Sequence, residues 1–132
     1  MCACSIMYKF EIEVSGGLEE VYGKMFKLLK DSGFVILSYV DVREILRKTV
    51  NKDIDPLYIL NICKPIAADE FISTSYETSM FIPCKIVLHQ VGEKTRVSLQ
   101  LISPQIEKFT DMPTDAARKY ENEIIEVLRR LG

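Results

Sequence analysis

The sequence predicts an α+β fold, and three observations lead to that class. Runs that alternate between apolar and polar residues, such as residues 8–14, predict strands with one buried and one wet face. Between them, apolar residues recur at helical spacing, which predicts amphipathic helices. The 132 residues show no internal repeat, linker or composition shift, so we expect a single domain over residues 1–132. A sheet covered on one face only favours α+β over a doubly wound parallel sheet.

The first half of the chain predicts two strands and two helices. After the strand over residues 8–14, Ser15-Gly16-Gly17 interrupts the pattern, and a helix follows over residues 18–32 with Gly33 as its cap. Residues 34–40 form an apolar, β-branched and aromatic run that predicts a second strand, which we expect to pair with the first. Asp41 and Glu44 have the spacing of a capping box for a partly exposed helix over residues 42–50.

The second half predicts three strands and two helices. Residues 57–62 form a strand that ends at Cys63, and Pro65 begins a helix that reaches about residue 73, before a polar connection over residues 74–78. Residues 85–91 and 94–102 form a hairpin around Gly92-Glu93. Residues 103–112 predict a loop. The last helix has Asp111 or Met112 near its cap, Pro113 in its first turn and Gly132 past its end.

Composition excludes several classes of protein. Seventeen basic and 19 acidic residues give a net charge of −2 in mixed clusters, which argues against nucleic acid binding. No apolar run reaches the 18 or so residues that span a bilayer, and the N-terminus does not have the pattern of a secretory signal, so we expect a cytoplasmic protein with no membrane contact. Met7 precedes the first strand and could serve as the start. Residues 1–6 are therefore expected to be a disordered or non-essential extension, with no role for Cys2 and Cys4.

Two internal cysteines form the candidate site. Cys63 and Cys84 each lie beside a lysine and close to a proline, at the ends of two predicted strands. Two strand ends of one sheet could bring both sulfurs to one edge. The cysteines could pack as small hydrophobic residues, or Lys64, Lys85 and the start of a helix could lower the pKa of a thiol and activate it. Zinc requires four ligands at short spacing, and His89 is the single histidine, so we predict no metal, and no cofactor can be named.

Other candidate features are weaker. Apolar residues in two predicted connections suggest a pocket lid or a subunit contact; these are Tyr76, Met80, Phe81, Phe109 and Met112. Gly16-Gly17 before a helix could hold an anion on backbone amides, but a tight turn is the simpler interpretation, because the phosphate-binding glycine patterns are absent.

Five short motifs carry a resemblance to a known family. They are Gly-Phe-Val-Ile-Leu at residues 33–37, Asp-Val at 41–42, Tyr-Ile-Leu at 58–60, Cys-Lys-Pro at 63–65, and Pro-Cys at 83–84. In this order they resemble the domain of unknown function 302 family, over about residues 7–131. In that family a Cys-Asn-Pro tripeptide or similar ends one strand and a Leu-Pro-Cys tripeptide begins another. The chain departs from the pattern at Lys64, where asparagine is common, and at Ser103-Pro104, where Asp-Pro is common.

The resemblance implies a curved, mainly antiparallel sheet with helices packed on one face, like the TATA-binding-protein superfold, and a homodimer. It implies no activity. Our leading hypothesis is therefore a homodimeric domain that binds a small ligand in a cleft near Cys63 and Cys84. The alternatives are a thiol-based redox protein or enzyme that uses both cysteines, and a structural interaction domain with inert thiols.

Overall fold

The computed structural model describes residues 8–132, and over them the expected α+β class is confirmed. The strands are β1 (Lys9–Ser15), β2 (Val35–Asp41), β3 (Leu57–Cys63), β4 (Cys84–Val91) and β5 (Lys94–Gln100). The α-helices are α1 (Leu18–Asp31), α2 (Val42–Val50), α3 (Pro65–Thr74), α4 (Ser103–Phe109) and α5 (Asp115–Arg129), and a 3-10 helix, η1 (Tyr76–Met80), follows α3. Each predicted strand is present within one or two residues of its expected bounds.

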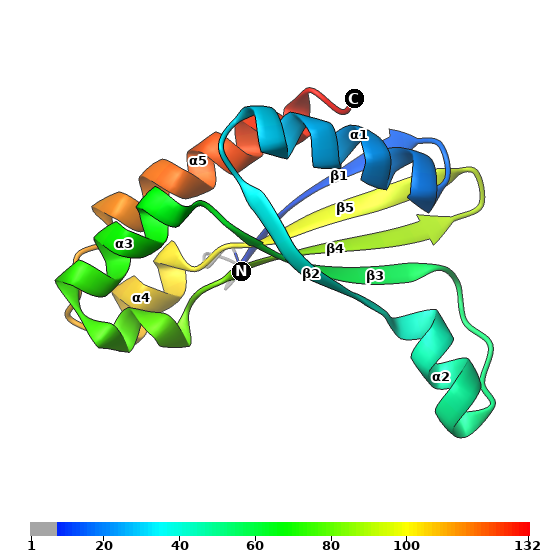
Figure 1. Cartoon of the computed structure of the whole chain (residues 1–132), viewed down its shortest axis with the longest axis horizontal. Helices are drawn as coiled ribbons and strands as arrows, with labels where there is room; N and C mark the ends of the chain where they lie inside the picture. Colours follow the sequence, from blue (N-terminus) through cyan, green and yellow to red (C-terminus); the bar gives the residue numbers. More distant parts are fainter. Residues whose placement is uncertain (1–7) are drawn as a thin grey trace, which may run out of the picture.

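The strands form one antiparallel sheet in the order β1-β5-β4-β3-β2 (Figure 1). The expected pairing of the first two strands is wrong, because they lie at opposite edges of this sheet. Consecutive strands are often neighbours, but α1 carries the chain across the sheet from β1 to the far edge. There β2 pairs with β3, with a register irregularity between Ile36 and Ser38.

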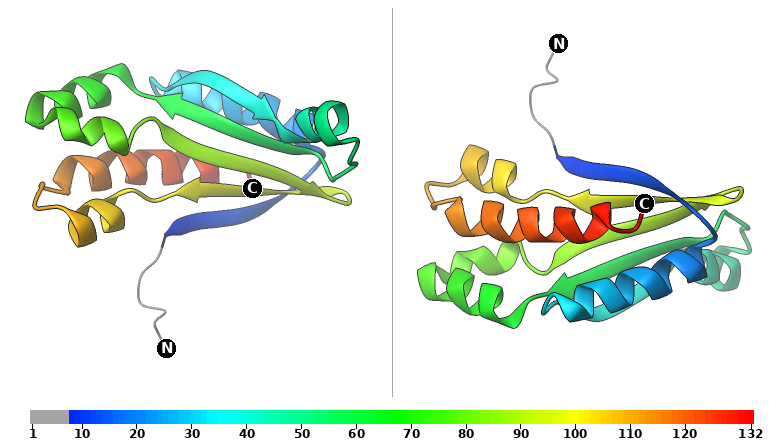
Figure 2. Two further views of the ribbon diagram at one scale, coloured as in Figure 1. Left: turned by 90° about the horizontal axis from the view of Figure 1, so that it is seen from below. Right: turned by 90° about the horizontal axis from the view of Figure 1, so that it is seen from above.

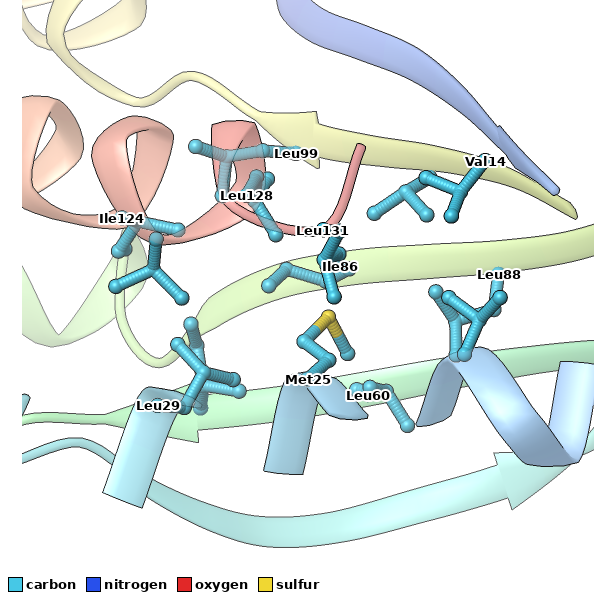
Figure 3. Close-up of a cluster of buried hydrophobic side chains, with 14 of the residues drawn as sticks. Val14, Met25, Leu29, Leu60, Ile86, Leu88, Leu99, Ile124, Leu128 and Leu131 are labelled. Carbon is cyan, nitrogen blue, oxygen red and sulfur yellow. The ribbon is translucent and has the colours of Figure 1, made fainter. Parts of the chain in front are cut away.

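Helices α1 and α5 lie side by side over one face of the sheet, as the view from above shows (Figure 2). Their apolar stripes meet the buried side chains of the central strands (Figure 3). Met25 of α1 and Ile124 of α5, for example, are fully buried. The predicted alternation is confirmed, since Val97 and Leu99 of β5 and Leu101 just after it all lie in this core. Burial of these side chains removes apolar surface from water and is the main term that stabilises the fold.

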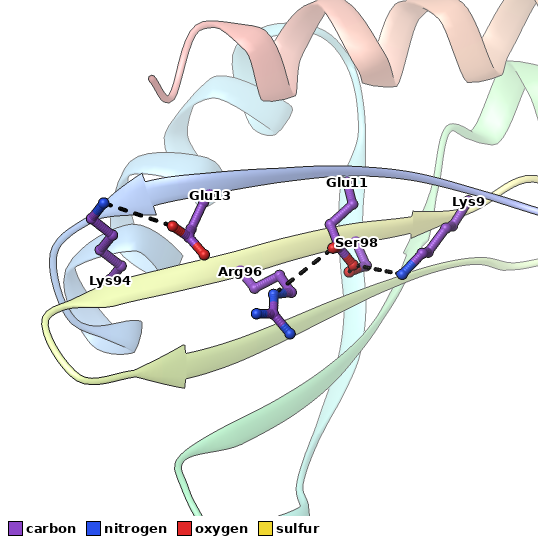
Figure 4. A network of polar contacts seen from close by, with 6 residues as sticks. All are labelled: Lys9, Glu11, Glu13, Lys94, Arg96 and Ser98. Carbon is purple, nitrogen blue, oxygen red and sulfur yellow. Dashed lines mark hydrogen bonds and ion pairs between the residues drawn. The ribbon is translucent and has the colours of Figure 1, made fainter.

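The opposite face of the sheet is polar at the β1 edge (Figure 4). Glu11 of β1 accepts hydrogen bonds from Lys9 at 2.9 Å and from Ser98 of β5 at 2.7 Å, and Arg96 lies 3.8 Å from the same carboxylate. Exposed ion pairs of this kind contribute little to stability. They do keep this face hydrated, as the alternating sequence predicts.

Two predicted connections are helical instead. Residues 103–112 contain α4, and the polar connection after α3 contains η1. The reason for α4 lies far along the chain. The buried carboxylate of Glu121 accepts hydrogen bonds from the backbone N–H of Ile102, and from the N–H and hydroxyl of Ser103 at 2.9 and 2.6 Å. Helix-capping rules consider only neighbouring residues, so they do not predict a helix start whose acceptor lies 18 residues away.

Helix α5 differs from the prediction in a smaller way, and helix α2 agrees with it. Helix α5 begins at Asp115, with Thr114 as its cap, so Pro113 lies before the helix rather than in its first turn. Helix α2 has the expected cap, since the Asp41 carboxylate accepts a hydrogen bond from the Glu44 N–H at 3.0 Å. It projects from the end of the sheet, and none of its residues is buried. Among residues 8–132 there is no helix with both the length and the apolar character to cross a membrane.

Candidate functional site

The sheet brings the two internal cysteines to the same end of two neighbouring strands. Strands β3 and β4 are antiparallel neighbours, and Cys84 pairs in register with Ile62, the residue before Cys63. Both half-buried cysteines, which are not joined by a disulfide, line one cavity. The cavity is partly open and is lined by residues of β3, β4, α3, α5 and the segments before β2 and β4. Its other lining residues are Phe34, Ile62, Lys64, Ala67, Ala68, Phe71, Ile82, Pro83 and Tyr120.

This cavity is small and almost entirely apolar. Its volume is about 20 Å³, which is about the space that one water molecule needs. Pockets for drug-sized ligands have volumes of about 300–1,000 Å³. In this conformation the cavity therefore accepts a single atom or a very small molecule, and a larger ligand requires a wall to move.

The surroundings of the two thiols do not favour activation, which was one of the alternatives that the sequence left open. Burial raises the pKa of the Cys63 thiol above its ordinary value. For Cys84, burial first, and then the negative charges of Glu121 and of ionised Cys63, raise the pKa to about 12. Both cysteines are therefore protonated at neutral pH, when they would be weak nucleophiles.

The two lysines do not act on the thiols as the sequence suggested. The Lys64 ammonium lies 2.6 Å from the Glu123 carboxylate of α5 and packs over the rings of Phe34 and Tyr120, with nitrogen-to-centroid distances of 5.2 and 5.8 Å. This ion pair ties the start of α3 to α5. Lys85 is exposed and borders a different groove.

Gly33 makes room for the Lys64 side chain. Its φ of +86° lies in the region that glycine adopts readily. A Cβ at this position would also approach Lys64 Cε to 3.3 Å. A glycine here thus serves both the turn after α1 and the ion pair at the mouth of the cavity.

The five candidate lid residues do not line the cysteine cavity. Tyr76, Met80 and Phe109 are 83%, 83% and 72% exposed. Phe81 and Met112 instead pack against a second hydrophobic cluster, formed by Ala67, Phe71, Ile102, Ile106, Ala117 and Tyr120. None of these five residues therefore contacts the cavity as a lid would, and the three exposed side chains lie on η1 and at the end of α4.

Sequence reasoning missed two carboxylates of α5 that act on residues of the cavity without lining it: Glu123, which pairs with Lys64, and Glu121, whose charge raises the pKa of Cys84. The role of Glu123 could not be predicted from its neighbouring residues, because its partner Lys64 is 59 residues away. Glu121 does carry a local signal, since it lies between Ala117 and Ile124 on the buried stripe of α5 and is only 5% exposed. A carboxylate on an apolar helical stripe indicates a buried polar contact.

The remaining candidate sites have structural roles. The Leu18 N–H at the start of α1 donates to the Gln90 side chain at 2.8 Å, so the backbone after Gly16-Gly17 already has an acceptor. His89 lies 3.2 Å from Asp55 on the polar side of the sheet. Residues 8–132 contain no group of three or more histidine, cysteine or acidic side chains that could hold a metal ion. Cys2 and Cys4 lie outside the described residues.

Comparisons with known proteins agree on the family. The model of the family "Domain of unknown function DUF302" matches residues 10–131. The crystal structure of an uncharacterized conserved DUF302 protein from Bacillus stearothermophilus superposes with a TM-score of 0.89, covering 96% of this chain and 100% of that one at 24% identity. At this identity the superposition supports the fold alone. No curated protein matches the sequence.

Proposed function

The chain belongs to the DUF302 family of domains of unknown function, and we propose that it binds a small apolar or thiol-reactive ligand in the cavity near Cys63 and Cys84. The single observation behind this proposal is that two cysteines, from the adjacent ends of strands β3 and β4, line one small apolar cavity. Free cysteines that serve only as core residues need no shared space between them, whereas a ligand does.

Helix α3 is the wall that we propose moves to admit the ligand. Its buried residues Ala67 and Phe71 pack in the second hydrophobic cluster rather than in the core under α1. The Lys64–Glu123 ion pair joins the start of this helix to α5. Separation of this single half-exposed pair would free the cavity mouth without exposing the main core.

The same proposal includes a homodimer in the cytoplasm, and the edges of the sheet favour one surface for it. The β1 edge carries Lys9, Glu11 and Glu13, and charges of this kind discourage pairing with another strand. The β2 edge instead exposes Val35, Leu37 and Tyr39, at 47%, 57% and 52%. A second copy that pairs with this edge would cover those apolar side chains.

The alternative with inert thiols also has an observation in its favour. The exposed Tyr76, Met80 and Phe109 would suit an interaction domain that binds a protein partner at the α3–α4 end. The redox alternative is less favoured, because burial raises the pKa of both thiols.

Native mass spectrometry of the freshly purified full chain tests the ligand proposal. We expect an adduct on the wild-type protein that the Ala68→Leu variant loses, because Ala68 is a half-buried cavity residue and the larger side chain would fill the space. Ala116→Leu is the matched control: it is also half-buried, but lines a different groove, and should keep the adduct. A bare wild-type protein, or an adduct that survives in Ala68→Leu, would contradict the proposal.

A further inference from the structure

We propose that a groove at the α3–α4 end of the molecule binds a basic amphipathic helix of another protein. The groove is lined by residues of α3, η1, α4 and the start of α5, which lie together at one end of the fold (Figure 1). This inference concerns a different surface from the cysteine cavity and does not depend on the ligand proposed there. Three features carry it: the groove, the apolar side chains beside it and the charge around it.

The groove combines an apolar lining with polar groups that accept hydrogen bonds. Its volume is about 260 Å³, more than ten times that of the cysteine cavity, so it has room for side chains of a partner. Its lining residues are Glu70, Phe71, Thr74, Thr78, Ile106, Met112, Pro113, Asp115 and Ala116. The hydroxyls of Thr74 and Thr78 already donate to backbone carbonyls, at 3.0 and 2.7 Å. The polar side chains of the groove therefore offer acceptors to a partner that brings donors.

The most exposed large apolar side chains of residues 8–132 belong to the same elements. They are between 64% and 83% exposed, and they are Ile66, Tyr76, Met80 and Phe109. On a helix, residues three or four positions apart are neighbours. Ile66 therefore lies next to Glu70 of the groove on α3, and Phe109 lies next to Ile106 on α4. Exposed apolar side chains beside a groove are typical of a surface that binds another protein.

The charge at this end favours a basic partner. Residues 65–80 and 103–116 contain six acidic residues and one basic residue, although the whole chain has a net charge of only −2. Glu107 pairs with Arg118 at 2.6 Å. The other five have no ion-pair partner within residues 8–132; they are Asp69, Glu70, Glu77, Asp111 and Asp115. Such a surface repels the phosphates of nucleic acids and of anionic lipids, and it attracts lysine and arginine.

An amphipathic helix with basic flanks matches both the apolar and the acidic features. Its apolar residues, at helical spacing, would enter the groove and cover Phe109, as in other complexes of a helix in a groove. Lysine or arginine beside this stripe would lie against Glu70 and Asp115. A purely apolar partner would remove these carboxylates from water without giving them a counter-charge, which costs free energy.

The test measures the binding of a designed peptide to the full chain by fluorescence anisotropy. The probe is a labelled peptide of leucine and lysine with leucine at helical spacing, and the control peptide has the same composition in a scrambled order. We expect the probe to bind at least about tenfold more tightly, because the two peptides have equal charge and only the probe presents an apolar face. Binding should weaken as salt is added, since the charges of the groove lie at the surface.

Charge variants separate the groove from general electrostatic attraction. Glu70→Gln combined with Asp115→Asn should weaken binding of the probe by about fivefold, through the loss of two surface ion pairs. Glu93→Gln combined with Glu126→Gln removes the same charge from exposed positions outside the groove. This control should change the affinity by less than about twofold, because salt screens distant charges.

A pair of alanine variants separates the groove from the cysteine cavity. Ala116→Leu fills part of the groove and should weaken binding of the probe by about tenfold, through loss of a packed contact, while the adduct of the cavity remains. Ala68→Leu should keep the binding of the probe and lose the adduct. Thermal unfolding establishes that each variant is folded, and the exposed charge variants give the result if Ala116→Leu does not fold.

Three results would contradict the inference. The first is that the probe does not bind, or binds no better than the scrambled peptide. The second is equal weakening by both pairs of charge variants, because the attraction would then come from total charge alone. The third is self-association in light scattering that Phe109→Ser abolishes, since the groove would then be covered by a second copy. None of these results bears on the ligand proposal, which is tested by the adduct.

Discussion

Cys84 illustrates how burial decides the chemistry of a residue. Its sequence neighbours, Pro83 and Lys85, suggested a thiol with a cation beside it, but Lys85 points into solvent while the Cys84 sulfur lies among apolar side chains. Loss of hydration therefore outweighs any attraction, and the pKa rises to about 12. Cys84 is therefore a buried, protonated thiol at neutral pH rather than an acidic nucleophile.

The raised pKa predicts a distinctive pH profile for thiol labelling. In the Cys2→Ser, Cys4→Ser background, the alkylation rates of Cys63 and Cys84 should rise with pH by about tenfold per unit below each pKa, because only the thiolate reacts. For Cys84 the rise should continue past pH 9, and Cys63 should react faster. Mass spectrometry of peptides after timed labelling gives both rates. A plateau below pH 8 at either cysteine would revive the redox hypothesis.

Glu121 is the other residue whose role depends on burial. Its carboxylate replaces the water that would otherwise satisfy the backbone N–H groups at the start of α4. Glu121→Gln keeps the size but presents an NH2 group to these donors, so we expect a loss in free energy of unfolding of about 1–3 kcal/mol. Urea unfolding followed by circular dichroism measures it.

Glu126→Gln, at an exposed position of the same helix, is the control for Glu121 and should change stability by less than about 0.5 kcal/mol. Equal effects of the two substitutions would show that the buried hydrogen bonds are not the source of the loss.

At the scale of elements, α2 differs from every other long helix of the fold. Helices α1 and α5 bury continuous stripes against the sheet, whereas α2 has no buried residue. Its stability therefore depends on local interactions such as the Asp41 cap and the pair of Glu44 with Lys48, 2.9 Å apart. A helix of this kind opens locally, at lower free energy than the core.

Removal of the cap should loosen α2 alone. Asp41→Ala should reduce the free energy of local opening by about 1 kcal/mol, while Asp41→Asn keeps an acceptor and should have a smaller effect. Amide hydrogen exchange should be about fivefold faster across α2 in Asp41→Ala and unchanged in β4, because the core does not depend on this cap. Faster exchange in both elements would indicate that α2 is coupled to global unfolding.

At the scale of the whole molecule, the two edges of the sheet differ in chemistry. Charged side chains protect β1, while β2 exposes apolar residues next to Phe26 of α1, which is 44% exposed. An unprotected edge of this kind readily pairs with another strand. The proposed homodimer would give β2 its missing neighbour.

A single charge on β2 should therefore separate the copies. Leu37→Lys should convert the dimer to a monomer in light scattering coupled to size exclusion, because the ammonium would be buried without a partner at the interface. Val91→Lys is the control, at 46% exposure near the end of β4, and should remain dimeric. A wild-type monomer, or a dimer that tolerates Leu37→Lys, would contradict this interface.

Local patterns in the sequence determined the elements of this protein. Alternation on β5 and helical spacing on α5 predict which side chains are buried, because the pleat of a strand and the turn of a helix fix side-chain direction within a few residues. The capping of α2 by Asp41 follows from equally short spacing. The position of both cysteines at one end of the sheet could also be predicted, since each lies at the end of a predicted strand.

Only the tertiary structure decided how these elements meet. The position of β2 beside β3, the Glu121 contact that begins α4, and the Lys64–Glu123 pair join residues that are 17 or more positions apart. The pKa of Cys84 likewise depends on walls from α3 and α5. Contacts at such separations depend on the packing of whole elements, and desolvation depends on everything that surrounds a group, so neither leaves a pattern in neighbouring residues.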